Sequence, residues 1–514
     1  MGNCLFSGLQ KSLRSHPKEA KVTIKYISTL GRSQPVEFDE AILSGFARDK
    51  GLFVPDTLPW FSRKQLSQMA ELSYTDLAHM ILSRFIPEKI IPPKTLKRIV
   101  KESFAQFTPR EVLPLVPSSL DPSILIMELF HGPSLSFKDI AMGFLIRVMD
   151  YFLQQKKEHL NLILATTGDT GPAAAHASAG KKTIDCWPLF PMGMITDEQE
   201  RQMTCLDAPN VYPVGVDNCP DGGDDLDRVV ENLFSHKAIK QELNLSSVNS
   251  INWCRIMVQS IHYFYGYFRA CDAIGDPIVF SVPSGAFGNL FAGYLAKAMG
   301  LPVTKFICSV NANKTLYQAF STGIFQKNHR VSTLSSAIDI VLPYNFWRFL
   351  YFATGRDSKK IQMWMEQLEK TGKVVLDPDT RRSMGKDFCA ISIDDEKTLE
   401  IMGRCLGGPS PCLVDPHTAV GIAGALLMKP EFSTATKIIC LSTAHPGKFP
   451  EATAKAMAMI KAQGKPCPKL PETATHPFLT QNAKSIRKLR ICKLEDLESE
   501  LIRIMTDQNK GSHG

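Results

Sequence analysis

The stretch His131-Gly132-Pro133-Ser134-Leu135-Ser136-Phe137-Lys138-Asp139 places one lysine between apolar residues and a glycine-proline turn. An amine kept partly out of water has a lowered pKa and becomes a usable nucleophile. Lys138 is therefore a candidate for holding an aldehyde cofactor as a Schiff base. The alternative is a solvated cation, one of 59 Lys and Arg residues, and this stretch taken alone favours that alternative.

After Asp121-Pro122 the chain repeats an order of short apolar strand, glycine-bearing loop and helix. Residues 162–179, 278–299 and 437–446 show the pattern most clearly, the last only as strand and loop. This alternation predicts an α/β fold of mostly parallel sheets covered by helices, with ligands bound at the carboxyl ends of the strands. The loops that follow the strands are therefore where a binding site is expected.

One of these loops, Ser284-Gly285-Ala286-Phe287-Gly288-Asn289, suits a phosphate group. It is small and glycine-rich, and it lies between a strand and a helix N-terminus, where backbone N–H groups point outward. It matches neither the Gly-x-Gly-x-x-Gly dinucleotide fingerprint nor a Walker loop, which indicates a phosphorylated cofactor or substrate instead. An ordinary tight turn is the alternative.

Two further stretches carry groups that bind anions. The loop Thr166-Thr167-Gly168-Asp169-Thr170-Gly171 offers hydroxyls and N–H groups for an α-carboxylate, with Asp169 free to orient a cofactor group. A plain helix cap is the alternative. Asn249 and Asn252 precede Arg255, whose guanidinium can pair with an anion in bidentate fashion. A surface arginine paired with an acid is the alternative there.

The composition excludes several classes of protein. With 514 residues, 44% hydrophobic and 21% charged, the chain has the profile of a soluble globular protein of two or three lobes. Its net charge of +8 is spread without a dense basic run, which argues against a nucleic-acid partner, and no apolar run is long enough for a membrane span. The 13 scattered cysteines indicate free thiols in a reducing compartment, with neither a disulfide framework nor a metal site. We expect a cytoplasmic monomer or homodimer.

Four segments are expected along the chain. Residues 1–20 form a flexible or targeting tail: the basic and Ser residues suit an organelle leader, and the start resembles an acylation signal except that Phe6 replaces Ser or Thr. Residues 21–120 form a small domain, with a strand at 21–27 and helices at 38–46, 62–70, 74–85 and 94–107. Residues 121–465 form the core, and residues 466–514 form a C-terminal helical extension packed on it.

Taken together, these motifs resemble the threonine synthase family, pyridoxal-phosphate enzymes with the tryptophan-synthase-β type of fold. The family's His-Gly-Pro-Thr-x-x-Phe-Lys-Asp motif stands at 131–139 with Ser134 for Thr, its Ser-Gly-Asp-Thr-Gly loop at 167–171 and its Pro-Ser-Gly-Asn-Phe-Gly-Asn/Asp loop at 283–289. Segments 26–29, 51–55, 249–253, 415–421 and 441–446 also match, in the family's order. The resemblance covers nearly everything from residue 25 to residue 452.

The resemblance implies a two-lobed fold-type II core that binds pyridoxal 5'-phosphate (PLP), preceded by a threonine-synthase-type N-terminal domain. Lys138 is then the catalytic residue, holding PLP as a Schiff base and later moving protons. Thr443 is implied to face the pyridine nitrogen, where a neutral hydroxyl makes a more moderate electron sink than an aspartate does. The residues implied to hold the cofactor phosphate are Gly285, Ala286, Phe287, Gly288 and Asn289. The residues expected to bind substrate are Thr167, Gly168, Asp169, Thr170, Asn249, Asn252 and Arg255.

The implied substrate is a phosphorylated amino acid, O-phospho-L-homoserine. Its Cα and Cβ protons are labilised, phosphate leaves from Cγ, and water adds at Cβ to give L-threonine, without a metal. A first alternative is a phospho-lyase that gives 2-oxobutyrate, ammonia and phosphate. A second is a non-catalytic descendant with a binding or regulatory role, against which the intact Lys138, Asn289 and Thr443 argue.

The chain also departs from the family pattern. Ala286 stands where synthases usually carry Asn, Met194 where they carry Arg or Lys, and Trp347 where they carry Glu. The threonine-synthase-like proteins of animals, which resemble phospho-lyases, also carry Ala in the cofactor loop and lack the cation. Loss of a cation at Met194 is expected to weaken capture of a phosphorylated substrate if that cation touches it. Further departures are Thr167, Pro172 and Leu30, in place of Ser, Ser and Arg.

Overall fold

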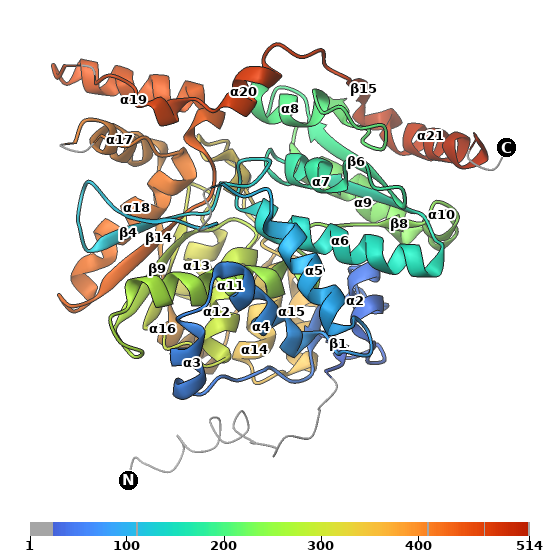
Figure 1. The fold of residues 1–514 in the computed structure, drawn as a ribbon, viewed down its shortest axis with the longest axis horizontal. Coiled ribbons are helices and arrows are strands. Elements are labelled where there is room, and N and C mark those ends of the chain that lie inside the picture. The colour runs from blue at the N-terminus through green and yellow to red at the C-terminus, as the bar shows by residue number, and fades with distance from the viewer. Residues whose placement is uncertain (1–23, 109–111, 409–410, 467, 512–514) are drawn as a thin grey trace, which may run out of the picture.

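Two sheets of mostly parallel strands organise the chain, and Figure 1 shows each with its own helices, one to the left of the view and one at the upper right. The computed structural model describes residues 24–108, 112–408, 411–466 and 468–511. The expected targeting or acylation tail at 1–20 lies outside these ranges. Within them, none of the helices combines the length and apolarity needed to cross a bilayer. The predicted α/β fold with parallel sheets is confirmed.

The first sheet has the strand order β13-β10-β9-β14-β4-β3, and only β3 runs antiparallel to its neighbour. Its strands are β3 (Leu115–Pro117), β4 (Ile124–Glu128), β9 (Ile278–Pro283), β10 (Lys305–Val310), β13 (Phe388–Ser392) and β14 (Lys437–Ser442). Because β14 lies between β4 and β9, the loops that lead to Lys138, Ser284 and Thr443 leave neighbouring strands at the same edge.

The second sheet has the order β15-β7-β6-β5-β8 and is parallel throughout. Its strands are β5 (Leu160–Ala165), β6 (Ile184–Pro191), β7 (Val214–Asp217), β8 (Leu245–Ser246) and β15 (Arg490–Lys493). We expected a helical C-terminal extension at 466–514, and the extension contains the helices α20 (Pro477–Asn482) and α21 (Leu497–Gly511). Its residues 490–493, however, add an edge strand to this sheet, a segment too short and too polar to stand out in the sequence.

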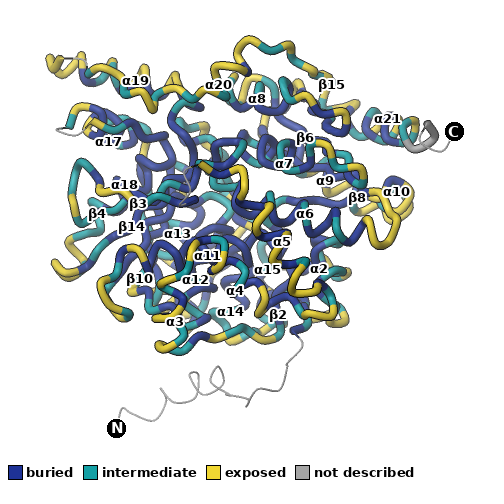
Figure 2. The backbone as a smooth tube through the Cα atoms, viewed as in Figure 1, coloured by how far each residue is buried: buried dark blue, intermediate teal, exposed yellow. Residues whose placement is uncertain are grey.

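Alternate residues of each buried strand pack on opposite helical layers, as the pleat of a strand requires. In β14, Ile439 and Leu441 join the core that includes α11 (Trp253–Ala270) and α12 (Gly288–Ala298), whereas Ile438 and Cys440 join the core around α18 (Pro416–Met428). Figure 2 shows these strands and helices as buried backbone.

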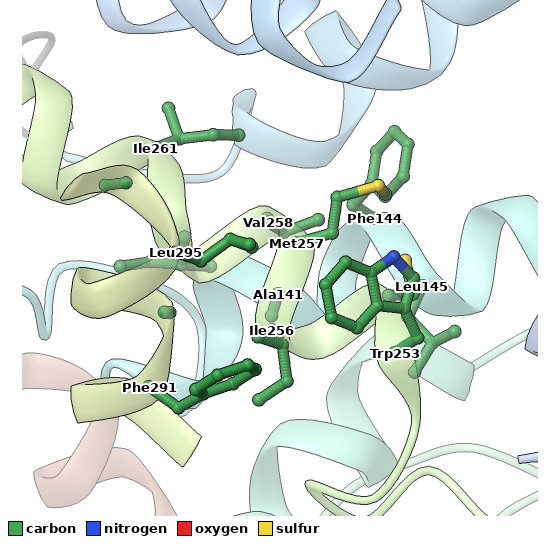
Figure 3. Close-up of a cluster of buried hydrophobic side chains, with 14 of the residues drawn as sticks. Ala141, Phe144, Leu145, Trp253, Ile256, Met257, Val258, Ile261, Phe291 and Leu295 are labelled. Atoms are coloured by element: carbon green, nitrogen blue, oxygen red, sulfur yellow. The ribbon is translucent and has the colours of Figure 1, made fainter. Parts of the chain in front are cut away.

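The helix that begins at Lys138 is fixed by this core. In Figure 3, Ala141 and Phe144 of α6 (Lys138–Lys156) lie near Trp253 and Met257 of α11, with Phe291 of α12 beyond them. All five side chains are fully buried. The start of α6 is therefore held rigidly at the edge where the loops meet.

The N-terminal region packs on the same core. Helix α4 matches its prediction, while α2, α3 and α5 end one to three residues earlier than expected. The first described strand is Tyr26–Ser28, and residues 21–23 of the strand expected at 21–27 lie outside the described residues. The remaining described strands and α-helices are β1 (Tyr26–Ser28), β2 (Phe53–Pro55), β11 (Ile324–Gln326), β12 (Lys373–Val375), α2 (Phe38–Ser44), α3 (Arg63–Met69), α4 (Tyr74–Phe85), α5 (Pro93–Phe104), α7 (Thr170–Ser178), α8 (Asp197–Thr204), α9 (Gly223–Ser235), α10 (Lys237–Glu242), α13 (Thr315–Thr322), α14 (Asn345–Ala353), α15 (Ser358–Thr371), α16 (Pro378–Asp387), α17 (Asp395–Leu406), α19 (Pro450–Ala462), α20 (Pro477–Asn482) and α21 (Leu497–Gly511).

Candidate active site

Lys138 is the first residue of α6, and the loop before it is bonded to the end of β14. The N–H of Phe137 donates to the carbonyl of Thr443 at 2.8 Å, and the N–H of His445 donates to the carbonyl of Leu135 at 3.0 Å. These bonds hold the lysine loop beside the loop that carries Thr443. Lys138 and Thr443, predicted from separate motifs, are thus brought together.

Asp139 shapes the turn that presents Lys138. Its carboxylate accepts hydrogen bonds from the N–H of Ser134 at 2.9 Å and the hydroxyl of Ser134 at 2.7 Å. A Cβ on Gly132 would lie 2.5 Å from the Asp139 side chain, so only glycine fits there. Burial raises the pKa of Asp139 to about 6, although the bonds from Ser134 oppose this. The motif residues around Lys138 therefore build its turn.

The Lys138 amine is suited to nucleophilic chemistry. Burial lowers its pKa to about 8; Asp169 opposes that shift, and the positive charges of Arg255 and Lys448 add to it. The neutral form is therefore still the minority near physiological pH, but it is far more populated than in a lysine with the ordinary pKa. The alternative of a solvated surface cation is wrong, because the side chain is partly buried among charged groups of other loops.

The loop at 284–289 connects β9 to α12 and offers backbone groups. Phe287 has a left-handed backbone, with φ of 63°, and its side chain is 1% exposed among the rings of Phe346 and Phe349. Its ring therefore anchors the loop in the core. The N–H groups at the start of α12 remain as the ligand-binding part of the loop.

Asn289 shows that this loop has unused binding capacity. Its Oδ1 accepts hydrogen bonds from Nε2 of His262 at 2.8 Å and from the hydroxyl of Tyr263 at 3.0 Å, which fixes the orientation of the amide. Its Nδ2 is buried and has no partner among the described residues. Buried donors are rarely left unpaired, so this one indicates a ligand that supplies the acceptor.

Arg255 is a buried cation that forms no ion pair with an acid in the described part of the chain. It is 2% exposed, its Nη1 donates to the carbonyl of Val248 at 3.1 Å, and its Nε has no partner among the described residues. Burial lowers its pKa to about 10. The alternative of a surface arginine paired with an acid is wrong; the guanidinium lies near Lys138 with donors to spare.

Asn252 and Asn249 differ from what was expected of them. Asn252 is fully buried; its Nδ2 donates to the carbonyl of Ile42 at 2.8 Å, and its Oδ1 accepts from the N–H of Cys254 at 3.1 Å as the cap of α11. Its amide is thus already engaged, which leaves it to orient the segment. The carbonyl of Asn249 accepts from the N–H of Asn252, and its side chain is partly exposed.

The loop at 166–171 is held by Thr166. The hydroxyl of Thr166 accepts from the N–H of Gly168 at 3.2 Å and of Gly171 at 3.0 Å, so the side chain of Asp169 is released from capping. Asp169 is instead 2% exposed, and its Oδ1 accepts from Nζ of Lys448 at 2.6 Å and Nε2 of Gln199 at 3.0 Å. Burial opposes its ionisation, but Lys448, Lys138 and His417 hold its pKa well below the usual range.

Lys448 was not predicted as a site residue. It closes the short helix Pro446–Lys448 directly after the recognised segment at 441–446, and it is fully buried. A lysine is almost never fully buried without a partner, but the sequence gives no sign of its burial. Its place just beyond a family-type motif was the only signal.

Met194 lies beside a different cation. Nη2 of Arg330 is 4.0 Å from the sulfur of Met194, and a Cβ on Gly222 would lie 2.9 Å from Nη1 of the same arginine. A Cβ on the next residue, Gly223, would lie 2.6 Å from the Thr167 side chain. Position 194 has lost its positive charge, as expected, but the guanidinium of Arg330 lies beside it. This guanidinium comes from a distant segment of the chain and lies at the edge of the Thr167 loop.

A separate cavity of about 540 Å³ lies behind the lysine loop. Leu135, His445, His476 and Cys412 are among its lining residues, and none of the residues predicted to bind cofactor or substrate lines it. Among the described residues, no group of three or more His, Cys, Asp or Glu side chains is arranged to hold a metal ion.

The fold and the site define a PLP-dependent enzyme. The partly buried lysine, the N–H groups before α12, the unpaired Asn289 amide and the hydroxyl of Thr443 fit the aldehyde, phosphate and ring of that cofactor. In keeping with this, a family model for pyridoxal-phosphate dependent enzymes matches residues 105–444. Models for the threonine synthase N terminus and the threonine synthase C-terminal region match residues 25–104 and 418–498. The chain belongs to the threonine synthase family.

Individual relatives agree. Threonine synthase of Saccharomyces cerevisiae is 36% identical over 464 residues, covering 84% of this chain and 89% of the relative. Threonine synthase-like 2 of Homo sapiens is 36% identical over 436 residues, with the same shares covered. A crystal structure of PLP-bound threonine synthase from Brucella melitensis superposes with a TM-score of 0.84 at 33% identity, covering 94% of this chain and 99% of that one.

Proposed function

We propose that this enzyme is a threonine synthase that converts O-phospho-L-homoserine and water to L-threonine and phosphate. The observation that carries the proposal is Arg255, a buried guanidinium near Lys138 that has no acid partner among the described residues. Burying a cation without a counter-charge is costly, so such a site is stabilised by an anionic ligand. A phosphorylated amino acid supplies that anion.

Each predicted group then has a part to perform. The chemistry that PLP supplies when bound is the withdrawal of electrons from the substrate Cα. Lys138, with a pKa of about 8, takes and returns protons at Cα and Cβ. The N–H groups from Gly285 to Gly288 and the Asn289 amide would hold the cofactor phosphate, and the hydroxyl of Thr443 would serve the ring nitrogen as a neutral partner that does not force its protonation.

The substrate is bound by groups from both lobes: the loop at 166–171 follows β5 of the second sheet, and Arg255 lies on α11, which packs on the first. The N–H groups at Thr167 and Thr170 bind its α-carboxylate at the start of α7, and Arg255 binds its phosphate. The N–H of Gly168 already donates to the Thr166 hydroxyl, so Gly168 shapes the loop. Asp169 orients the cofactor side of the site. Further parts of the proposal are a division into segments at 1–20, 21–120, 121–465 and 466–514, and a cytoplasmic monomer or homodimer.

A phospho-lyase that forms 2-oxobutyrate, ammonia and phosphate is the second candidate. Ala286 in the cofactor loop and the missing cation at Met194 favour it, and threonine synthase-like 2 of Homo sapiens is as similar to this chain as the yeast synthase is. Both candidates share the steps up to loss of phosphate. They differ in whether water is then added at Cβ.

The test is turnover of O-phospho-L-homoserine with threonine, 2-oxobutyrate and phosphate measured together. A synthase gives threonine and phosphate in equal amounts, whereas 2-oxobutyrate and phosphate in equal amounts would replace the first proposal by the second. The control is Lys138→Ala, which should release no product and lack the cofactor absorbance of the wild type. A wild type that stays colourless with added PLP would support a non-catalytic protein.

A further inference from the structure

Lys448 and Asp169 form a buried ion pair that joins the two lobes at the candidate active site. Nζ of Lys448 lies 2.6 Å from Oδ1 of Asp169 and 3.0 Å from the carbonyl of Ser134, and both charged side chains are at most 3% exposed. Lys448 follows β14 of the first sheet, and Asp169 follows β5 of the second. Ser134 belongs to the lysine loop, so one ammonium group connects three site segments.

The contacts of Lys448 leave Asp169 with one free oxygen. Oδ1 of Asp169 accepts hydrogen bonds from Nζ of Lys448 and Nε2 of Gln199, and no hydrogen bond to Oδ2 exists among the described residues. The carbonyl of Ser134 is likewise shared, by Lys448 and by Nε2 of Gln202 at 2.8 Å. The pair therefore fixes the direction of the carboxylate as well as its charge.

The charges around Lys138 show what this arrangement does. The negative charge of Asp169 favours the ammonium form of Lys138, whereas the positive charges of Arg255 and Lys448 disfavour it. His417, like Lys448 and Lys138, lowers the pKa of Asp169. If Lys448 were neutral, the carboxylate would be balanced mainly by Lys138 itself. A lysine held as an ammonium in an ion pair is a poor nucleophile.

We propose that Lys448 is a positioning residue that takes up the charge of Asp169 and so keeps the Lys138 amine free to react with the cofactor aldehyde. Nothing in this role requires Lys448 to touch substrate. This role adds Lys448 to the residues of the proposed function. It rests on one part of that proposal, that Lys138 is the lysine that carries PLP.

The experiment measures how fast PLP attaches to apoprotein prepared from the holoenzyme, by absorbance and by borohydride trapping at Lys138, across pH 6 to 10. The pH at which the attachment rate is half of its maximum reports the pKa of the Lys138 amine. In the wild type this pH should lie near 8. In Lys448→Met the midpoint should rise by roughly one unit or more, which slows attachment at pH 7 about tenfold. In Asp169→Asn it should fall.

The double variant Lys448→Met with Asp169→Asn makes the inference refutable. Removing both charges should return the midpoint close to the wild-type value, and this variant leaves no unpaired buried charge if Lys448→Met alone fails to fold. The matched control is Lys181→Met, which breaks the 2.9 Å pair with Asp150 near the far end of α6 and should leave the midpoint unchanged.

A structural role alone predicts a different pattern. In that case Lys448→Met and the double variant lower the thermal midpoint, while the pH midpoint of PLP attachment stays at the wild-type value in all variants. That result, or equal shifts in Lys448→Met and the double variant, overturns the inference. Neither readout uses O-phospho-L-homoserine, so failure of the proposed function would be visible separately in the turnover assay.

Discussion

Replacing Arg255 by methionine should separate function from stability. The side chain is buried, has no acid partner in the described structure and makes one hydrogen bond, to the carbonyl of Val248. Loss of a charge-assisted hydrogen bond to a substrate anion costs about 1.5–3 kcal/mol, which corresponds to a fall of about 10- to 150-fold in kcat/KM. Removing an uncompensated buried charge should leave the thermal midpoint unchanged or raise it.

Arg348 is the matched control. It is also fully buried, but its guanidinium donates to the carbonyls of Phe53, Ser250 and Ile251 and to Oδ1 of Asn345. Arg348→Met should therefore destabilise the protein by at least about 3 kcal/mol, because several buried acceptors lose their donor.

The assay for both variants combines steady-state turnover with thermal unfolding and with binding of inorganic phosphate by calorimetry. Arg255→Met should weaken phosphate binding in step with kcat/KM while its unfolding midpoint is preserved. The reasoning is refuted if Arg255→Met unfolds as early as Arg348→Met while binding phosphate as the wild type does. Arg255 would then be a structural residue.

Three further predictions follow from single contacts. Arg330→Met should raise KM for the phosphorylated substrate about tenfold, and adding Met194→Arg should recover most of the loss, measured by initial rates; an unchanged KM would remove Arg330 from the site. Phe287→Ala should lower stability by about 3–5 kcal/mol in chemical denaturation, because its ring is 1% exposed. Hydrogen bonds with Cys405 and then with Ser119 lower the pKa of Cys412 to about 6. Cys412 should therefore react with iodoacetamide at pH 7 before the other cysteines, which mass spectrometry of early time points can check.

Much of the fold was predictable because its signals are local. The predicted units at 162–179, 278–299 and 437–446 contain or overlap β5, β9 and β14, since each strand is a short apolar run followed by a glycine or hydroxyl loop. By contrast, β15 was missed because an edge strand of four mostly exposed residues has no apolar pattern of its own. It forms only by pairing with β7, a partner more than 270 positions away in the chain.

The site was predictable in its motifs but not in its partnerships. Lys138, Asn289 and Thr443 stand out as residue types in loops, but burial decides what they do. The sequence could not separate Asn252, which caps α11, from Arg255 three positions later, which has donors to spare. Nor could the sequence show that the hydroxyl of Thr166, rather than the carboxylate of Asp169, accepts the hydrogen bond from the first turn of α7. The Asp169 carboxylate is therefore available to pair with Lys448.

The candidate active site carries an excess of positive charge. Lys138, Arg255 and Lys448 bring three cationic groups to the same buried region, and Asp169 is the carboxylate that acts on Lys138 there. An excess of buried positive charge weakens the fold unless anions complete it. A phosphorylated cofactor and a phosphorylated substrate with its own carboxylate are ligands of that kind. The same positive charges add to burial in lowering the pKa of the Lys138 amine, so one distribution of charge serves both ligand capture and the reactivity of the lysine.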